Sequence, residues 1–126
     1  MGAVDLAGIL GQVLPVEVEE DGALTVSHDG TLASIRQVEI SEGLDMVSLN
    51  QLLAWDVVPS DDLRKSVAAQ GNRTMLGAVV LTERSDGLSD VMLRYNFPVG
   101  GLDEPALQTL VLMVLAGGAL VRRALV

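Results

Sequence analysis

The hydrophobic positions of this 126-residue chain follow two periods, one typical of helices and one typical of strands. Residues 4–14 gather apolar side chains on one helical face, and Pro15 follows them. This pattern predicts a short amphipathic helix that ends at Pro15. The apolar face of this helix consists of Leu6, Ile9, Leu10, Val13 and Leu14.

A block of predicted strands occupies residues 16–58. The turn signal Asp21-Gly22 lies within residues 16–28, which therefore form either a two-stranded hairpin or one broken strand. Residues 31–40 are extended, and the alternation slips near Ser34 and Ile35, which predicts a bulge there.

Residues 46–58 form a longer apolar run that fits either a strand or a helix over residues 49–55. We favour a strand because valines flank the run and Pro59 stops it. Leu49, Leu53, Trp55 and Val57 would then share a phase.

Ser60-Asp61-Asp62 is typical of a helix start, and a short helix is predicted over residues 63–70, closed by Gly71-Asn72. Two strands follow at residues 75–82 and 91–97, joined by a turn at residues 85–87. Together these elements predict an α+β fold, an antiparallel sheet packed by helices. The predicted order is α-β-β-β-α-β-β-α, with three or four strands before the second helix, in one domain over residues 1–126.

The last predicted helix, residues 106–121, is the most apolar element of the chain. It starts at Asp103-Glu104-Pro105, and Arg122 and Arg123 follow where cations suit the helix dipole. Within it only Gln108 and Thr109 are polar. A helix that is apolar all round must be buried all round, so a partner is expected on its outer side.

We expect the sheet to be contacted by Leu107, Leu110, Val111 and Val114. The opposite side, our predicted dimer interface, consists of Leu112, Met113, Ala116 and Leu120. Gly117-Gly118 lies inside the helix, where it either permits close helix–helix approach or causes a kink or early end.

Charge and composition narrow the classes of partner. Hydrophobic residues make up 49% of the chain, and 17 acidic against 8 basic residues give a net charge of -9. Such a surface repels phosphate backbones, so no nucleic-acid partner and no anionic membrane surface is expected. The chain has no cysteine, and no basic segment precedes the apolar residues near its start. A cytoplasmic location is therefore expected.

Candidate chemistry is sparse. His28 beside Asp29 would be the only acid–base pair with a histidine, but neighbouring strand residues point to opposite faces. Asp61 and Asp62 have a sufficient structural role in a first helical turn. Gly100-Gly101 precedes acids rather than a phosphate-binding helix start. We therefore predict no catalytic residue, no cofactor and no metal site.

Loose structural motifs cover residues 60–125. They are Gln-Gly-Asn-Arg at residues 70–73, the apolar residues 75–81, the turn Asp86-Gly87, residues 91–98, and residues 100–103 before the long helix. In these motifs and in element order the chain resembles the YbjN family of bacterial proteins, which has the type III secretion chaperone-like fold. The N-terminal half matches in layout alone. The bias towards Gly, Ala, Val, Leu and Asp is typical of a high-GC bacterium such as an actinobacterium.

The resemblance implies a non-enzymatic protein, usually a homodimer, of a family described as regulators or sensory-transduction factors. In secretion chaperones, apolar patches hold an extended client segment. Our leading hypothesis is a dimeric protein-binding module, chaperone-like or regulatory, with an unidentified client. The alternatives are a small-ligand sensor or cryptic carboxylate enzyme, and a protein anchored in a membrane through residues 106–121. The second alternative is weaker, because an uninterrupted apolar run from 110 to 121 falls short of the ~20 residues that a span needs.

Overall fold

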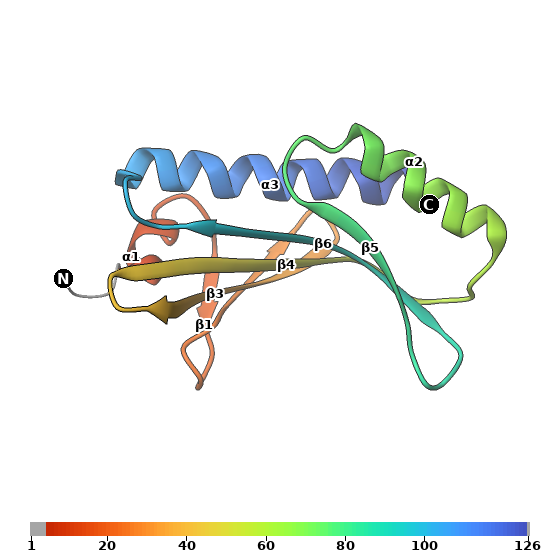
Figure 1. Cartoon of the computed structure of the whole chain (residues 1–126), viewed down its shortest axis with the longest axis horizontal. Coiled ribbons are helices and arrows are strands. Elements are labelled where there is room, and N and C mark those ends of the chain that lie inside the picture. Colours follow the sequence, from red (N-terminus) through yellow and green to blue (C-terminus); the bar gives the residue numbers. More distant parts are fainter. Residues whose placement is uncertain (1–4, 126) are drawn as a thin grey trace.

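The computed structural model describes residues 5–125, which form one antiparallel sheet with three helices on the same side of it (Figure 1). The predicted α+β class is confirmed, and residues 16–58 contain four strands. The elements are α1 (Leu6–Leu10), β1 (Val16–Val18), β2 (Leu24–His28), β3 (Thr31–Ser41), β4 (Leu44–Val57), α2 (Asp61–Arg73), β5 (Ala78–Glu83), β6 (Ser89–Pro98) and α3 (Glu104–Leu125).

The six strands lie in the order β1-β2-β3-β4-β6-β5. β1 and β2 form a hairpin, with Val16 opposite Val26. Residues 46–58 belong to a strand, because all but Val58 lie in β4, which pairs with β3 on one side and β6 on the other. The long strands β3, β4 and β6 therefore make the centre of the sheet, while β5 is an edge strand.

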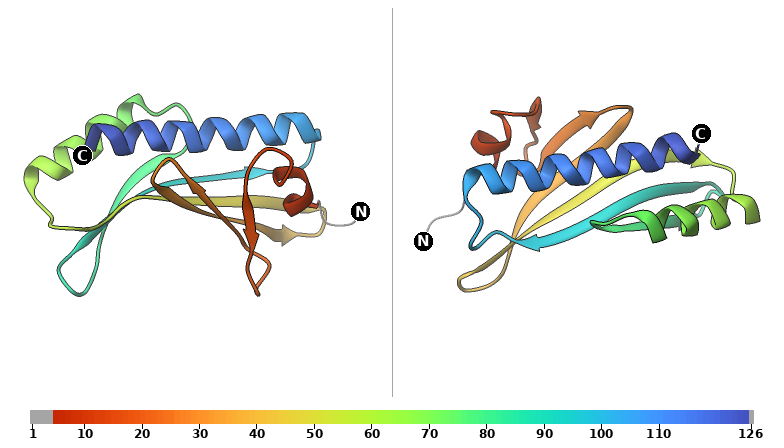
Figure 2. Two further views of the ribbon diagram at one scale, coloured as in Figure 1. Left: turned by 180° about the vertical axis from the view of Figure 1, so that it is seen from behind. Right: turned by 90° about the horizontal axis from the view of Figure 1, so that it is seen from above.

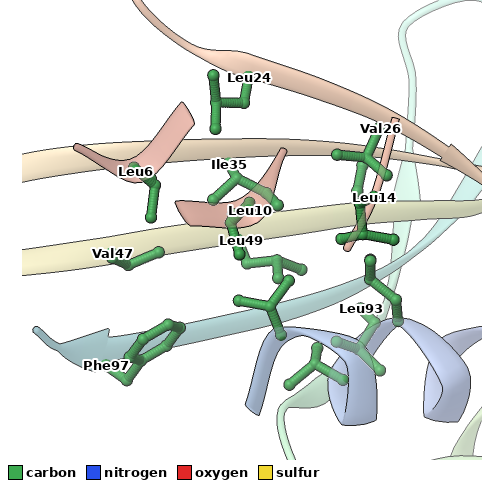
Figure 3. Packing of buried hydrophobic residues seen from close by; sticks show 14 of the residues in the cluster. Leu6, Leu10, Leu14, Leu24, Val26, Ile35, Val47, Leu49, Leu93 and Phe97 are labelled. Atoms are coloured by element: carbon green, nitrogen blue, oxygen red, sulfur yellow. The ribbon is translucent and has the colours of Figure 1, made fainter. Parts of the chain in front are cut away.

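The core lies between one face of the sheet and the helices α1 and α3 (Figure 3). The strands contribute alternate residues, as the period of two predicts. Leu24, Val26, Ile35, Val47, Leu49, Leu93 and Phe97 point to this side, and Leu6, Leu10 and Leu14 cover one end of it.

Several boundaries differ from the sequence predictions. Helix α1 is only five residues long, because the chain turns at Gly11 and continues through bends to Leu14. Leu6, Ile9, Leu10 and Leu14 are buried as predicted, whereas Val13 is exposed. Val4, the predicted first residue, lies outside the described residues.

The predicted bulge is misplaced. The pairing of β3 with β4 is continuous at Ser34 and Ile35 and shifts instead between Glu39 and Ser41. The apparent slip in alternation arises because Leu32 is on the opposite face from Ile35. The phase predicted for β4 also fails after Leu53, since the pairing with β6 is irregular there and Asp56 has a positive φ of 57°.

Helix α2 starts as predicted, with the Ser60 hydroxyl accepting a hydrogen bond from the Leu63 amide. It does not stop at Gly71-Asn72 but continues to Arg73. The following strand begins at Ala78 rather than at Met75, so residues 74–77 form a connecting loop. Gly77, with a φ of 86°, turns the chain from this loop into β5.

Candidate interaction surface

Helix α3 lies across the sheet and presents one side to the core. Leu107, Val111 and Val114 are buried there as predicted, and Leu110 is partly buried against the core. Leu115, Ala119 and Val121 are buried as well, although they were not predicted to contact the sheet. The buried side of α3 is therefore wide and continues to its last turns.

The outer side of α3 is apolar and uncovered within the described chain. Met113 is 50% exposed and Leu120 is 61% exposed, and Ala116 between them is also exposed. Leu112, the fourth residue of the predicted dimer interface, is half-buried and packs against the core instead. In the view from above, no other described element crosses the outer side of α3 (Figure 2).

A groove of about 380 Å³ runs along this outer side, between α3 and the end of α2. We call it the α2–α3 groove. Met113, Gly117 and Leu120 line it from α3, and Met75 and Leu76 line it from the loop after α2. Met75 is 86% exposed, which places a large apolar side chain at the rim with nothing described covering it.

Met75 and Leu76 were not predicted as members of this surface. Both were expected in a strand, where alternation would have buried one of them. The signal that could have separated them from β5 was Gly77, which interrupts the apolar run from Met75 to Leu81.

The two adjacent glycines of α3 have different roles. A methyl group added at Gly118 would overlap the side-chain amide of Gln51, whereas one added at Gly117 would meet no atom of residues 5–125 within 4 Å. The helix continues past both residues to Leu125, so of the alternatives for Gly117-Gly118 an early helix end is wrong. Gly118 permits close approach, but of a strand side chain rather than of a helix.

Gln51 is fully buried in the middle of β4 and ties the sheet to α3. Its Nε2 donates to the Thr31 hydroxyl at 2.8 Å and to the Leu115 carbonyl at 3.0 Å. Its Oε1 has no hydrogen-bond partner in the described part of the chain and faces Gly118. This contact fixes the position of α3 on the sheet, and with it the outer side that lines the groove.

The last turn of α3 is fastened by two arginines. The Arg122 guanidinium donates to the Leu53 carbonyl at 2.6 Å and lies 5.8 Å from the ring centre of Trp55. Arg123 pairs with Asp29 at 3.2 Å. These contacts keep the helix against the sheet as far as its C-terminal end.

The face of the sheet opposite the helices carries a second apolar feature. Leu32, Leu52, Met92 and Val80 lie side by side across β3, β4, β6 and β5, because each is paired in register with the next. No described helix covers this row (Figure 1). A polar row of Ser34, Asn50 and Arg94 lies beside it.

Several carboxylates are held by arginine side chains. Arg84 contacts Asp56 at 2.6 Å, Asp86 at 2.8 Å and Asp90 at 3.1 Å. The hydrogen bond from Arg84, followed by that from the Leu88 amide, holds the pKa of Asp86 below its usual value. Likewise Arg36 and then the Ala23 amide lower the pKa of Asp21. Such carboxylates remain ionised and are poor general acids near neutral pH.

His28 and Asp29 approach each other, contrary to the sequence argument. Asp29 lies in the turn after β2 with a φ of 45°, so its carboxylate comes within 3.8 Å of His28 Nε2. The same carboxylate also pairs with Arg123. The arrangement fastens the β2–β3 turn to α3.

The described residues contain no candidate metal site. Over residues 5–125, no three His, Asp or Glu side chains are placed to hold a metal ion together.

Helix α3, with 22 residues, is long and apolar enough to cross a membrane by length and composition. It is longer than the uninterrupted apolar run on which the sequence argument relied. Seven of its residues are nevertheless buried within the fold, and five of these belong to the same core cluster as Leu49 and Leu93.

Comparison with known proteins identifies the fold. No protein-family model and no curated protein matches the sequence. Among solved structures, the chain is similar to "YbjN, a putative transcription regulator from E. coli", with a TM-score of 0.69 and 15% sequence identity. The likeness covers 92% of this chain and 84% of that chain. The chain therefore has a YbjN-like fold, as the sequence resemblance implied.

Proposed function

We propose that this chain is a non-catalytic protein-binding module that works as a homodimer in the cytoplasm, in a regulatory or chaperone-like role. The observation that carries this proposal is the uncovered apolar side of α3 beside the α2–α3 groove. Met75, Met113 and Leu120 together expose a contiguous apolar surface. Burying a side chain of this size stabilises a complex by about 1.5–3 kcal/mol, so such a surface favours a protein partner.

The chemistry around the groove supports binding rather than catalysis. Among the described residues, Arg73 is its one charged lining residue, and Gln70 and Thr74 are its other polar lining side chains. The carboxylates of Asp86 and Asp21 do not line the groove and are paired with Arg84 and Arg36. A catalytic or ligand site would need polar groups that converge in one enclosed pocket.

A regulatory role would act through protein contacts rather than through DNA. The net charge of -9 opposes a phosphate backbone, and nucleic-acid binding needs a basic surface. The likeness to YbjN supports the fold of a regulator but does not by itself assign a partner. The open face of the sheet, with its apolar row from Leu32 to Met92, offers a separate surface for an extended client.

The proposal is tested by placing one charge on the outer side of α3. Leu120→Glu should convert a dimer to a monomer in sedimentation velocity, because a carboxylate would be buried in an apolar contact. Ile40→Glu is the matched control, since Ile40 is also 61% exposed but lies near the end of β3. A strict monomer for the unmodified chain, or a dimer that both variants keep, would remove the α3 surface from the proposal.

A further inference from the structure

Uncharged positions along the outer side of α3 form a pattern that is symmetric about its own centre. We call this set the α3 stripe; it consists of the exposed Thr109, Met113, Ala116, Leu120 and Ala124 and the partly exposed Gly117, and it leaves out the exposed Arg123 and the first two residues of the helix. Met113 precedes Ala116 by three residues, and Leu120 follows Gly117 by three residues. Thr109 and Ala124 lie four residues further out on either side. The stripe therefore matches itself when the helix is reversed about the point between Ala116 and Gly117.

We infer that the occupant of this surface is a second copy of the same chain, with the two α3 helices antiparallel and a two-fold axis between Ala116 and Gly117. The inference rests on the proposed homodimer and specifies its geometry. A two-fold interface brings the same patch of both subunits together, so that residue i contacts j and j contacts i. A stripe that reads alike in both directions meets this condition.

The side chains of the stripe suit such a crossing. In the antiparallel arrangement Met113 of one chain lies opposite Leu120 of its partner, and the reverse, so each large side chain meets another large one. Ala116 and Gly117 lie at the crossing point, where small side chains let two helix axes come close. A side chain added at Gly117 would enter open space in the isolated chain, so this space is available to the partner.

Charge favours the antiparallel over the parallel arrangement. Between Pro105 and Val121 the helix carries no charged residue, while Glu104 lies near its start and Arg123 near its end. A parallel pair would place Arg123 beside Arg123 and Glu104 beside Glu104. The antiparallel pair instead brings Arg123, which also contacts Asp29, to about 9 Å from the partner's Glu104 along the helix axis, at 1.5 Å per residue. The antiparallel arrangement also brings the partly positive start of each helix near the partly negative end of the other.

The area that a stable dimer needs implies that the loop after α2 takes part. Stable interfaces bury about 800 Å² on each partner, which is more than one helical stripe provides. Met75 and Leu76 form the far wall of the α2–α3 groove and extend the apolar surface beyond α3. The partner's α3 would thus cover the rim at Met75.

Engineered cysteines can measure the helix orientation directly, since the natural chain has none. Three single variants are needed: Met113→Cys, Leu120→Cys and, as a control for random collision, Glu42→Cys in the β3–β4 turn. Each is oxidised alone and in pairs, and disulfide-linked dimers are counted on a non-reducing gel. In the antiparallel pair, two cysteines at 113 lie about 10 Å apart along the axis, beyond the ~7 Å that a disulfide tolerates between Cα atoms.

The inferred geometry predicts that mixing Met113→Cys with Leu120→Cys gives cross-linked dimers far above the Glu42→Cys background. Each of the two variants alone should stay near that background. Efficient linking of Met113→Cys to itself would show a parallel pair and overturn the inference. A chain that sediments as a dimer but gives only background for all α3 cysteines would also overturn it, while leaving the homodimer intact. A chain that sediments as a monomer would remove the homodimer and the geometry together.

Discussion

At the scale of single residues, the position of α3 depends on Gln51 and Gly118. The Gln51 amide occupies the space that a side chain at position 118 would need. Gly118→Ala should therefore destabilise the fold by about 1–3 kcal/mol, as overpacking of a core does. Gly117→Ala should stabilise it by up to about 1 kcal/mol, because alanine is the better helix former and nothing obstructs it. Urea unfolding of both variants in the Leu120→Glu background, in which the chain is expected to be a monomer, measures these effects without a contribution from the proposed dimer contact at Gly117.

A double variant separates the Gln51 contact from helix propensity. Gly118→Ala combined with Gln51→Ala should show a large favourable coupling free energy, because the second change removes the group that the first one strikes. Equal destabilisation by Gly118→Ala in the presence and absence of Gln51 would show that the contact does not fix α3.

The sequence could not predict the role of Gln51. It occupies an inward position of β4 between Leu49 and Leu53, where the pattern expects an apolar residue. Its partners, the Thr31 hydroxyl and the Leu115 carbonyl, are 20 and 64 residues away along the chain. Local periodicity carries no information about such contacts. The requirement for a glycine at position 118, which leaves room for the Gln51 amide, therefore could not be predicted either.

At the scale of elements, the sequence predicted the type and order of helices and strands well because each has a clear period. The inward positions of β6 at Val91, Leu93 and Phe97 follow strict alternation and are all buried. Boundaries were less accurate where tertiary contacts outweigh local preference. The end of α2 is an example, since the helix continues through Gly71 and Asn72 and closes at Thr74, whose hydroxyl donates to the Gln70 carbonyl.

The β5–β6 hairpin should lose stability in acid. Its Asp86 carboxylate accepts hydrogen bonds from Arg84 and from the Leu88 amide, and these lower its pKa below 3.8 in the folded chain. The unfolded chain then binds protons more readily, so the stabilisation is present above about pH 3.8 and is lost as pH falls through the folded pKa. Asp86→Asn should flatten this part of the thermal unfolding profile against pH. Glu42→Gln is the control, because it also removes one carboxylate. If Asp86→Asn loses as much thermal stability in acid as the unmodified chain does, groups other than Asp86 cause the loss.

At the scale of the whole molecule, the chain is strongly acidic, whereas the surface that we propose for the dimer contact is uncharged. Two copies at net charge -9 repel each other, while the α3 stripe itself holds no charge to screen. Added salt should therefore tighten the proposed dimer rather than loosen it. Sedimentation equilibrium across a salt series measures this, and a dissociation constant that rises with salt would point to an interface held by ion pairs.

Part of the proposed partner surface could be predicted from the sequence. Periodicity placed Met113, Ala116 and Leu120 on the outer side of α3, where the structure exposes them. It could not supply Met75, because that residue joins the surface through the loop after α2 and the close approach of α2 to α3. The contacts of a helix with elements distant in sequence decide which apolar positions remain uncovered.

The central claim is that the outer side of α3 binds a second copy of this chain. Sedimentation velocity of the full chain at micromolar concentrations, without detergent, tests it most directly. The account predicts a species of twice the 13.3 kDa chain mass, which Leu120→Glu reduces to the single chain while Ile40→Glu does not. A single species of 13.3 kDa at every concentration would contradict it.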